Sequence, residues 1–184
     1  MFTKTDQELE KMGAKITTRE IQQQPDLWKE AFQNYTAKKS EIDSFLGKIT
    51  STYPDQKIRV IFTGAGTSAY VGDTLRPYLN RAGDTSHFVF ESIPTTDIVS
   101  APLDNLRSDD PTILVSFARS GNSPESVATV ELAEKLIKNL YQITITCAPE
   151  GHLAKKAENE DGNLLLLQPA LSNDKGFAMT GSFS

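Results

Sequence analysis

Two short segments of the chain have the composition of anion-binding loops. They are Gly64–Ser68 (GAGTS) and Ala118–Ser123 (ARSGNS), and each directly follows an apolar run. Glycine allows a backbone to approach a ligand closely, while hydroxyls and backbone N–H groups donate hydrogen bonds. A helix that begins after such a loop also presents the positive end of its dipole. These features suit an anion, most naturally a phosphate.

Seven residues of these loops are the candidate phosphate contacts. They are Gly66, Thr67, Ser68, Arg119, Ser120, Gly121 and Ser123. Arg119 offers a planar fork of donors to phosphate oxygens. Ser123 has a second explanation, because a serine directly before Pro124 is typical of a helix N-cap. The first loop alone is explained equally well by a glycine-rich turn that relieves crowding.

The elements that position these loops follow from the alternation of apolar runs and helical patterns. Strands are predicted at 57–63, 87–90, 111–117, 141–147 and 164–167, helices at 69–81, 123–140 and 153–158, and a loop at 91–101. Apolar strands that alternate with helices indicate an α/β fold with a mainly parallel five-stranded sheet covered on both faces. Right-handed crossovers place the loops after the strands at one edge of such a sheet. Both candidate loops should therefore meet there.

The region before the first strand is predicted to be a helical extension. Residues 1–18 are polar and lack a period, which predicts a frayed or weakly helical start, and Pro25 is a plausible first residue of a helix. Beyond it, apolar residues recur every three to four positions, at Trp28, Ala31, Phe32, Tyr35, Ile42, Phe45, Leu46 and Ile49. This stripe is expected to pack on the domain or on a second subunit, which makes it the candidate contact of a homo-oligomer.

Composition limits the partners and the compartment. The chain has 184 residues, a net charge of −5 and no basic block, which argues against nucleic acid or an anionic membrane as a partner. No apolar run approaches the roughly 20 residues of a membrane span, and residues 1–13 lack the apolar centre of a signal peptide. The single cysteine, Cys147, is expected to be a buried strand thiol in a reducing compartment. A soluble, cytoplasmic protein is expected.

One alternative is a nicotinamide dinucleotide-binding domain. Gly64, Gly66 and Ala69 form a loose match to the dinucleotide fingerprint, and Glu91 lies roughly where a ribose-binding acid is found. Such a domain does not require a second hydroxyl-rich loop, so a sugar-phosphate site that needs no cofactor is preferred. Two histidines and scattered acids give no metal-site spacing, and no metal is expected.

The stretches GAGTS at 64–68 and SFARSGNSPES at 116–126 resemble the two loops of the sugar isomerase (SIS) domain family. Three further stretches are similar to its AgaS-type subgroup: TREIQQQPDLWKEAF at 18–32, TTDIVSAP at 95–102 and NDKGFAMTGSF at 173–183. Members of the subgroup are described as tagatose-6-phosphate ketose/aldose isomerases or galactosamine-6-phosphate deaminating isomerases. The resemblance implies a three-layer sandwich whose two loops hold the phosphate of an open-chain hexose or hexosamine phosphate. Ala118 departs from the family, since many members have another serine there.

The resemblance also implies a division of the chain. Members of this type have two SIS domains in tandem, so 1–52 is interpreted as a helical extension, 53–170 as the SIS domain, and 171–184 as a linker or the start of a second domain. By the same resemblance, the glutamate and histidine that act as base and acid are expected beyond Ser184. His152 is the candidate within this chain, although a histidine in such a loop more often lies on the surface.

These expectations describe the N-terminal half of an aldose/ketose isomerase, with or without deamination. Galactosamine 6-phosphate and tagatose 6-phosphate are the substrates that the resemblance suggests, and the chain alone is expected to be catalytically incomplete. The alternative is a non-catalytic module that senses a sugar phosphate.

Overall fold

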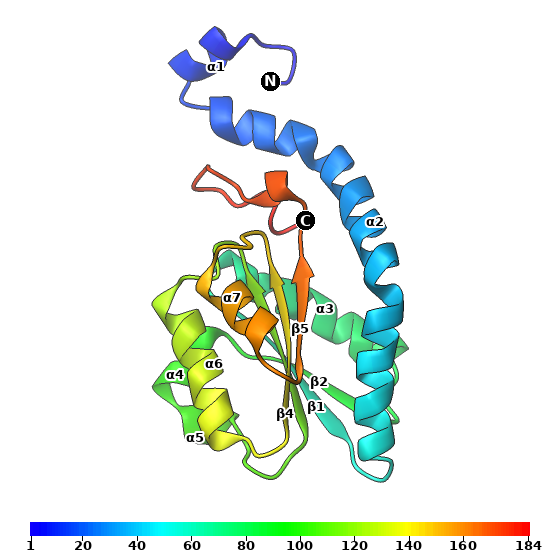
Figure 1. Ribbon diagram of the computed structural model, residues 1–184. Coiled ribbons are helices and arrows are strands. Elements are labelled where there is room, and N and C mark those ends of the chain that lie inside the picture. The colour runs from blue at the N-terminus through cyan, green and yellow to red at the C-terminus, as the bar shows by residue number, and fades with distance from the viewer.

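A sheet of five strands forms the centre of the structure (Figure 1). The computed structural model describes residues 1–184, and its strands are β1 Ile58–Gly64, β2 Phe88–Ser92, β3 Thr112–Ala118, β4 Leu140–Thr146 and β5 Asn163–Leu167. Their order is β2-β1-β3-β4-β5, and every neighbouring pair is parallel. The central strands β1 and β3 are covered on both faces, which is why their sequences are largely apolar rather than alternating. The predicted α/β fold is confirmed.

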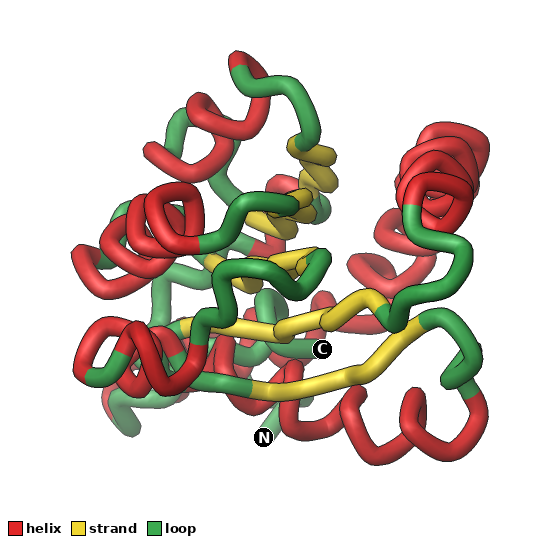
Figure 2. Tube along the Cα trace, turned by 90° about the horizontal axis from the view of Figure 1, so that it is seen from below, coloured by secondary structure: helices red, strands yellow, loops and turns green.

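Helices cover both faces of this sheet, as Figure 2, seen from below, shows. They are α1 Asp6–Lys11, α2 Lys15–Thr52, α3 Thr67–Ala82, α4 Thr95–Ser100, α5 Pro102–Asn105, α6 Pro124–Leu136 and α7 His152–Asn159, followed by a 3-10 turn, η1 Ala170–Ser172. The C-terminal half of α2 packs with α3 on one face, and α4, α6 and α7 pack on the other. This is the predicted three-layer sandwich, with the expected helical extension at its N-terminal end.

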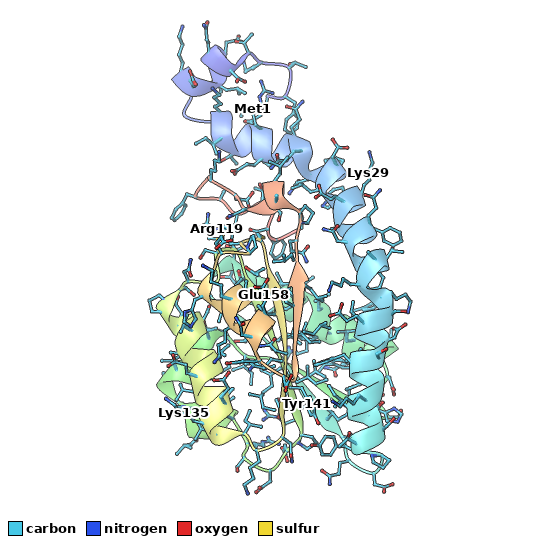
Figure 3. All side chains as sticks on the ribbon, in the orientation of Figure 1. Met1, Lys29, Arg119, Lys135, Tyr141 and Glu158 are labelled. Carbon is cyan, nitrogen blue, oxygen red and sulfur yellow. The ribbon has the colours of Figure 1, made fainter.

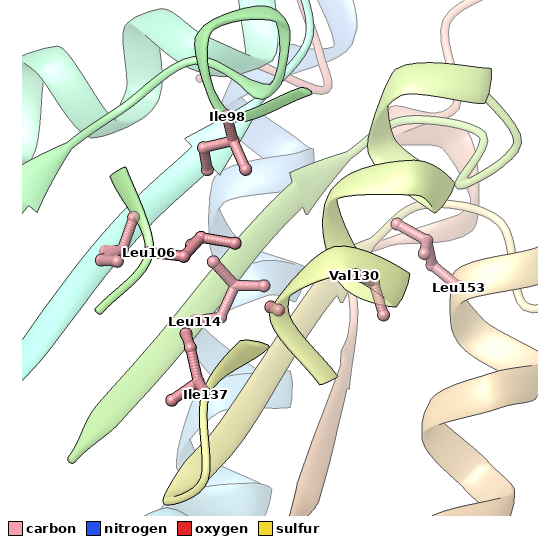
Figure 4. Close-up of a cluster of buried hydrophobic side chains, with 8 residues drawn as sticks. Ile98, Leu106, Leu114, Val130, Ile137 and Leu153 are labelled. Carbon is pink, nitrogen blue, oxygen red and sulfur yellow. The ribbon is translucent and has the colours of Figure 1, made fainter. Parts of the chain in front are cut away.

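Two buried clusters hold the layers together. The cluster under α4, α6 and α7 is drawn in Figure 4 and consists of Ile61, Ile98, Leu106, Leu114, Val130, Ala133, Ile137 and Leu153. The cluster under α2 and α3 consists of Ile49, Ile58, Val60, Phe62, Ile113 and Val115. Successive residues of one strand thus serve opposite layers, as the two-residue period of a strand requires. Burying each large apolar side chain contributes about 1.5–3 kcal/mol to folding.

The N-terminal region is more helical than predicted. A capping box between Thr5 and Glu8 starts α1, which buries Leu9 completely. α2 begins well before Pro25 and continues through it, so the prediction that a helix begins at this proline is wrong. Of the frayed or weakly helical start that was predicted, the structure shows helix. A proline within a helix removes one backbone hydrogen bond and bends the helix, and α2 changes direction near Lys29 (Figures 1 and 3). The part of α2 before this bend is held by the C-terminal residues of the chain, described below.

The apolar stripe of α2 packs on the sheet only near its C-terminal end. Ile49 is fully buried, and Phe45 packs against the same cluster. Closer to the bend, Trp28, Phe32 and Tyr35 remain 51%, 69% and 48% exposed. No helix of the structure, α2 included, is long and apolar enough to cross a membrane.

The stretch predicted as a loop at 91–101 contains α4, which is a correction to the sequence interpretation. α4 has six residues, too few for a periodic pattern to be visible in the sequence. Its Ile98 is completely buried in the cluster of Figure 4. The Thr95 hydroxyl, in its first turn, donates to the Gly64 carbonyl at 3.1 Å. This hydrogen bond joins α4 to the start of the first candidate loop. The helix predicted at 123–140 also ends earlier, at Leu136.

Candidate functional site

The two candidate loops lie side by side at the carboxyl edge of the sheet. β1 and β3 are neighbours, and Gly64 at the end of β1 pairs in register with Phe117 near the end of β3. Neighbouring strands are about 4.8 Å apart, so the loops that continue from them begin within a few ångströms of each other. This edge is where open α/β sheets bind their ligands.

The first loop needs its glycines for geometric reasons. A β-carbon on Gly64 would lie 2.7 Å from the carbonyl carbon of Ser68, because the chain folds back over the end of β1. Gly66 has φ +57°, a conformation that other residues rarely adopt, and it is the N-cap residue of α3. The turn places Thr67 and Ser68 in the first turn of α3, where the Ser68 N–H donates to the Ala65 carbonyl at 3.2 Å and both side chains carry hydroxyls. The alternative of a purely crowding-driven turn explains Gly64, but it does not explain the two hydroxyls.

The second loop is held by the loop that follows β4. Gly121 has φ +66°, and its carbonyl accepts a hydrogen bond from the Leu153 N–H at 3.1 Å. The side-chain oxygen of Asn122 accepts from the His152 N–H at 2.8 Å. Two loops from neighbouring strands thus form one hydrogen-bonded unit. The His152 side chain is exposed, and its backbone rather than its imidazole makes this contact.

The hydroxyls of the second loop already have local partners. The Ser120 hydroxyl accepts a long hydrogen bond, 3.4 Å, from the Asn122 N–H. Ser123 occupies the N-cap position of α6, as expected, but its side chain makes no cap hydrogen bond to the backbone. It donates instead to the Ser126 hydroxyl at 2.6 Å. Ser123 therefore has the backbone position of an N-cap residue, but its hydroxyl is bonded to Ser126 and does not cap the helix.

A cavity of about 220 Å³ adjoins both loops. Its lining residues are Leu27, Trp28, Ala31, Ser68, Val71, Phe117, Ala118, Ile145, Cys147, Gln168, Pro169, Ser172, Gly181, Ser182, Phe183 and Ser184. Ser68 is the only candidate contact in this lining, and the other six lie outside it. Small-molecule sites commonly measure about 300–1,000 Å³, so this cavity suits a small ligand, and its lining combines apolar residues such as Phe117 with the hydroxyls of Ser68 and Ser182. A larger groove of about 820 Å³, between α2 and the outer edge of β5, includes none of the loop residues.

Arg119 points toward the end of the chain rather than toward the loop hydroxyls. Its Nη1 donates to the Asp174 carbonyl, and its Nε is buried without a partner. Figure 3 shows Arg119 directly beneath the C-terminal segment, defined here as Pro169–Ser184. The guanidinium thus joins the second loop to this segment.

The C-terminal segment forms the wall of the cavity that faces the loops, and sequence reasoning missed this role. The Trp28 indole N–H donates to the Ser184 hydroxyl at 3.2 Å. The Gln24 side chain donates to the Thr180 carbonyl at 2.9 Å. These partners are 156 residues apart in the sequence. No local pattern links such distant residues, so only the fold reveals that Trp28 lines the cavity.

Cys147 also lines the cavity, as a buried thiol directly after β4. Burial raises the pKa of this thiol, and the hydrogen bond with Ser172 opposes that shift. The thiol is therefore protonated at neutral pH and is a poor nucleophile.

Glu91 does not fill the role that the nicotinamide alternative gave it. It pairs with the buried Arg59, whose Nε donates to the Glu91 carboxylate at 2.9 Å. Arg59 also donates to the Asn105 carbonyl at 3.1 Å. The carboxylate thus neutralises a buried guanidinium within the sheet layer.

The family profile described as "SIS domain" matches residues 53–183. The chain belongs to the SIS domain family. An SIS relative, D-galactosamine-6-phosphate deaminase AgaS of Escherichia coli, is 44% identical over 168 residues, which are 91% of this chain. The crystal structure of the Escherichia coli tagatose-6-phosphate ketose/aldose isomerase aligns with 91% of this chain at 42% identity and a TM-score of 0.84. An SIS structure from Clostridium novyi NT aligns with 100% of it at 44% identity and a TM-score of 0.89.

These comparisons confirm the resemblance to the SIS family and to its AgaS-type members. This SIS chain spans less than half the length of the relatives it matches: 42% of the AgaS protein, 44% of the isomerase chain and 45% of the Clostridium novyi chain.

Proposed function

We propose that this SIS domain binds the phosphate of a hexose or hexosamine 6-phosphate at its two adjacent loops, as part of an aldose/ketose isomerase. The observation that carries the proposal is the pairing of Gly64 with Phe117, which puts two glycine- and hydroxyl-rich turns at one sheet edge. The first turns of α3 and α6 both begin there, so two helix N-termini favour the same anion. The candidate contacts remain Gly66, Thr67, Ser68, Arg119, Ser120, Gly121 and Ser123.

In this proposal the phosphate binds at the loops and the sugar extends into the 220 Å³ cavity. Ser68 lies at the boundary, because it belongs to the loop and also lines the cavity. On the opposite wall the Ser182 hydroxyl donates to Asp174 and can accept from a sugar hydroxyl, whereas the Ser184 hydroxyl is already bonded to Trp28, Gln24 and Thr180. Isomerisation then moves a proton between C1 and C2 through an enediol. With a 2-amino sugar it passes through an enolamine to an imine at C2, which water hydrolyses to the ketone with release of ammonia. The names of the relatives suggest galactosamine 6-phosphate and tagatose 6-phosphate as substrates.

The cavity lining supplies no carboxylate and no imidazole. We therefore propose that the proton-transfer groups lie outside residues 1–184 and that this chain alone binds without turning over. His152, the candidate within the chain, is exposed and does not line the cavity. The same observation favours the second candidate function, a non-catalytic sensor. A turnover assay on the longer protein distinguishes these two functions, because an isomerase converts the sugar phosphate and a sensor only binds it.

The binding proposal is tested by calorimetric titration with hexose and hexosamine 6-phosphates and with NADH. The wild-type chain should bind a sugar phosphate and should not bind NADH. Ser68→Ala with Ser120→Ala should weaken sugar-phosphate binding by at least about 10-fold, since a hydrogen bond to a charged group contributes about 1.5–3 kcal/mol. Ser44→Ala, on an exposed position of α2, is the matched control. Equal affinity in all three proteins would contradict the proposal.

A further inference from the structure

Asp174 is a buried carboxylate that organises the C-terminal segment. It is 3% exposed, and all of its side-chain hydrogen bonds go to one short stretch of chain. Oδ1 accepts from the Gly181 N–H at 3.0 Å. Oδ2 accepts from both the N–H and the hydroxyl of Ser182, each at 2.8 Å. Charge-assisted bonds of this kind are about twice as strong as neutral ones.

The stretch that Asp174 binds is also the stretch that lines the cavity. Gly181, Ser182 and Ser184 all belong to the lining, while Asp174 itself does not. The fit is tight, since a β-carbon on Gly181 would lie 3.0 Å from Asp174 Oδ1 and 3.0 Å from Leu27 Cδ1. Asp174 therefore supports the cavity wall from behind.

The backbone of the same residue is connected to the phosphate loop. The Asp174 carbonyl accepts from the Arg119 guanidinium, so one residue links the second loop to the wall opposite it. Glu20 of α2 fixes the adjoining backbone, because its Oε1 accepts from the N–H groups of Lys175 at 2.6 Å and Gly176 at 3.0 Å. The backbone around residue 174 is thus fixed by Arg119 of the second loop and by Glu20 of α2.

We infer that Asp174 is a positioning residue for the sugar portion of the ligand. Its side chain sets the position of the Ser182 backbone and hydroxyl, and its carbonyl connects that position to Arg119 of the second loop. The inference rests on the proposed function. On this inference, the loops bind the phosphate, and residues 174–184 distinguish a sugar phosphate from inorganic phosphate.

The test compares two ligands by calorimetry, inorganic phosphate and galactosamine 6-phosphate, in the wild-type chain and in Asp174→Asn. The amide keeps the shape of the carboxylate but replaces one acceptor with a donor, which faces N–H groups that are themselves donors. Inorganic phosphate should bind the variant within about twofold of wild type, whereas the preference for the sugar phosphate should fall by about tenfold. Ser182→Ala removes one bond to Asp174 together with the hydroxyl assigned to the sugar, so it should lower the preference as well. Asp161→Asn, in an exposed turn, should change nothing.

Three outcomes would overturn the inference. An unchanged preference in both Asp174→Asn and Ser182→Ala would show that the segment does not select the sugar. Equal losses for both ligands would show that Asp174 acts on the phosphate loops instead. If the wild-type chain binds neither ligand, the proposed function itself fails, and that result is distinct from the first two. Should Asp174→Asn not fold, Ser182→Ala decides between the same outcomes.

Discussion

The carbonyl oxygen of Ser120 lies so close to Gly151 that a β-carbon at position 151 would be 2.2 Å from it. This contact joins the second candidate loop to the loop after β4. Real β-carbon contacts do not occur at that distance, and the obstacle is backbone rather than a flexible side chain. The position of Ser120 therefore depends on the absence of a side chain at residue 151.

Gly151→Ala should displace the second loop and destabilise the fold. Overpacking of this kind costs about 1–3 kcal/mol, and the displaced loop should bind sugar phosphate more weakly. Gly47→Ala is the matched control, because an added β-carbon meets nothing within 4 Å there. Within α2 that control should stabilise the chain by about 0.5–1 kcal/mol. Denaturant unfolding of both variants measures the difference, and similar stabilities would contradict the argument.

Glu20→Gln should loosen the C-terminal segment without unfolding the sheet. Glu20 is 8% exposed and binds two backbone N–H groups of that segment. The variant should show faster amide exchange at Lys175 and Gly176, while β1 and β3 keep their protection. Glu30→Gln, an exposed substitution on the same helix, should leave exchange unchanged. Uniformly faster exchange would instead mean that Glu20 supports the whole fold.

Cys147 should react slowly with iodoacetamide at pH 8. Burial raises the pKa of its thiol, so the reactive thiolate is scarce, and the buried side chain lines the 220 Å³ cavity. A bound sugar phosphate should slow the reaction further. Mass spectrometry of the alkylated chain measures both rates. Alkylation at the rate of free glutathione, unaffected by ligand, would place the thiol outside the site.

Asp84 should make the chain more stable above about pH 4 than below pH 2. Hydrogen bonds from Ser86, and then from His87, lower the pKa of this carboxyl from 3.8 to about 2 in the folded chain. Because the folded value lies below the unfolded one, the contribution is present above pH 3.8 and is lost as the pH falls toward 2. The difference in melting temperature between wild type and Asp84→Asn should shrink over that interval. If the difference in melting temperature between the two proteins did not depend on pH, the ionised Asp84 carboxylate would not be its cause.

The exposed aromatic residues of α2 should form the contact of a homo-oligomer. Trp28, Phe32 and Tyr35 recur on one side of the helix, and the ring centroids of Phe32 and Tyr35 are 6.4 Å apart. Exposed apolar groups of this size mark association surfaces. Phe32→Glu should lower the mass measured by sedimentation, whereas Asn34→Glu should not. A monomeric wild type would contradict the proposal.

The sheet and the position of the loops were predictable because they depend on local pattern. Apolar runs such as Ile113–Val115 indicate buried strands wherever they occur, and parallel topology then requires the following loops to share one edge. The glycines at 64, 66 and 121 likewise reflect local backbone geometry.

What could not be predicted depends on contacts between distant parts of the chain. The start of α2 was missed because its first half is polar and contains Pro25, and its support comes from residues near 180. The role of Asp174 was missed because an acid in a polar stretch looks like a solvated residue. The hydrogen bond between Trp28 and Ser184 could not be predicted either, because nothing in the sequence relates two residues so far apart.

The contact between Trp28 and Ser184 has a consequence for how the protein is made. A ribosome completes both candidate loops before it adds residues 181–184, whereas it makes α2 before any of the strands. The cavity is therefore bounded by one segment that is made before the strands and another that is made after all five of them. Until that moment Trp28 has no partner for its indole N–H, and the newly formed loops stand open to solvent.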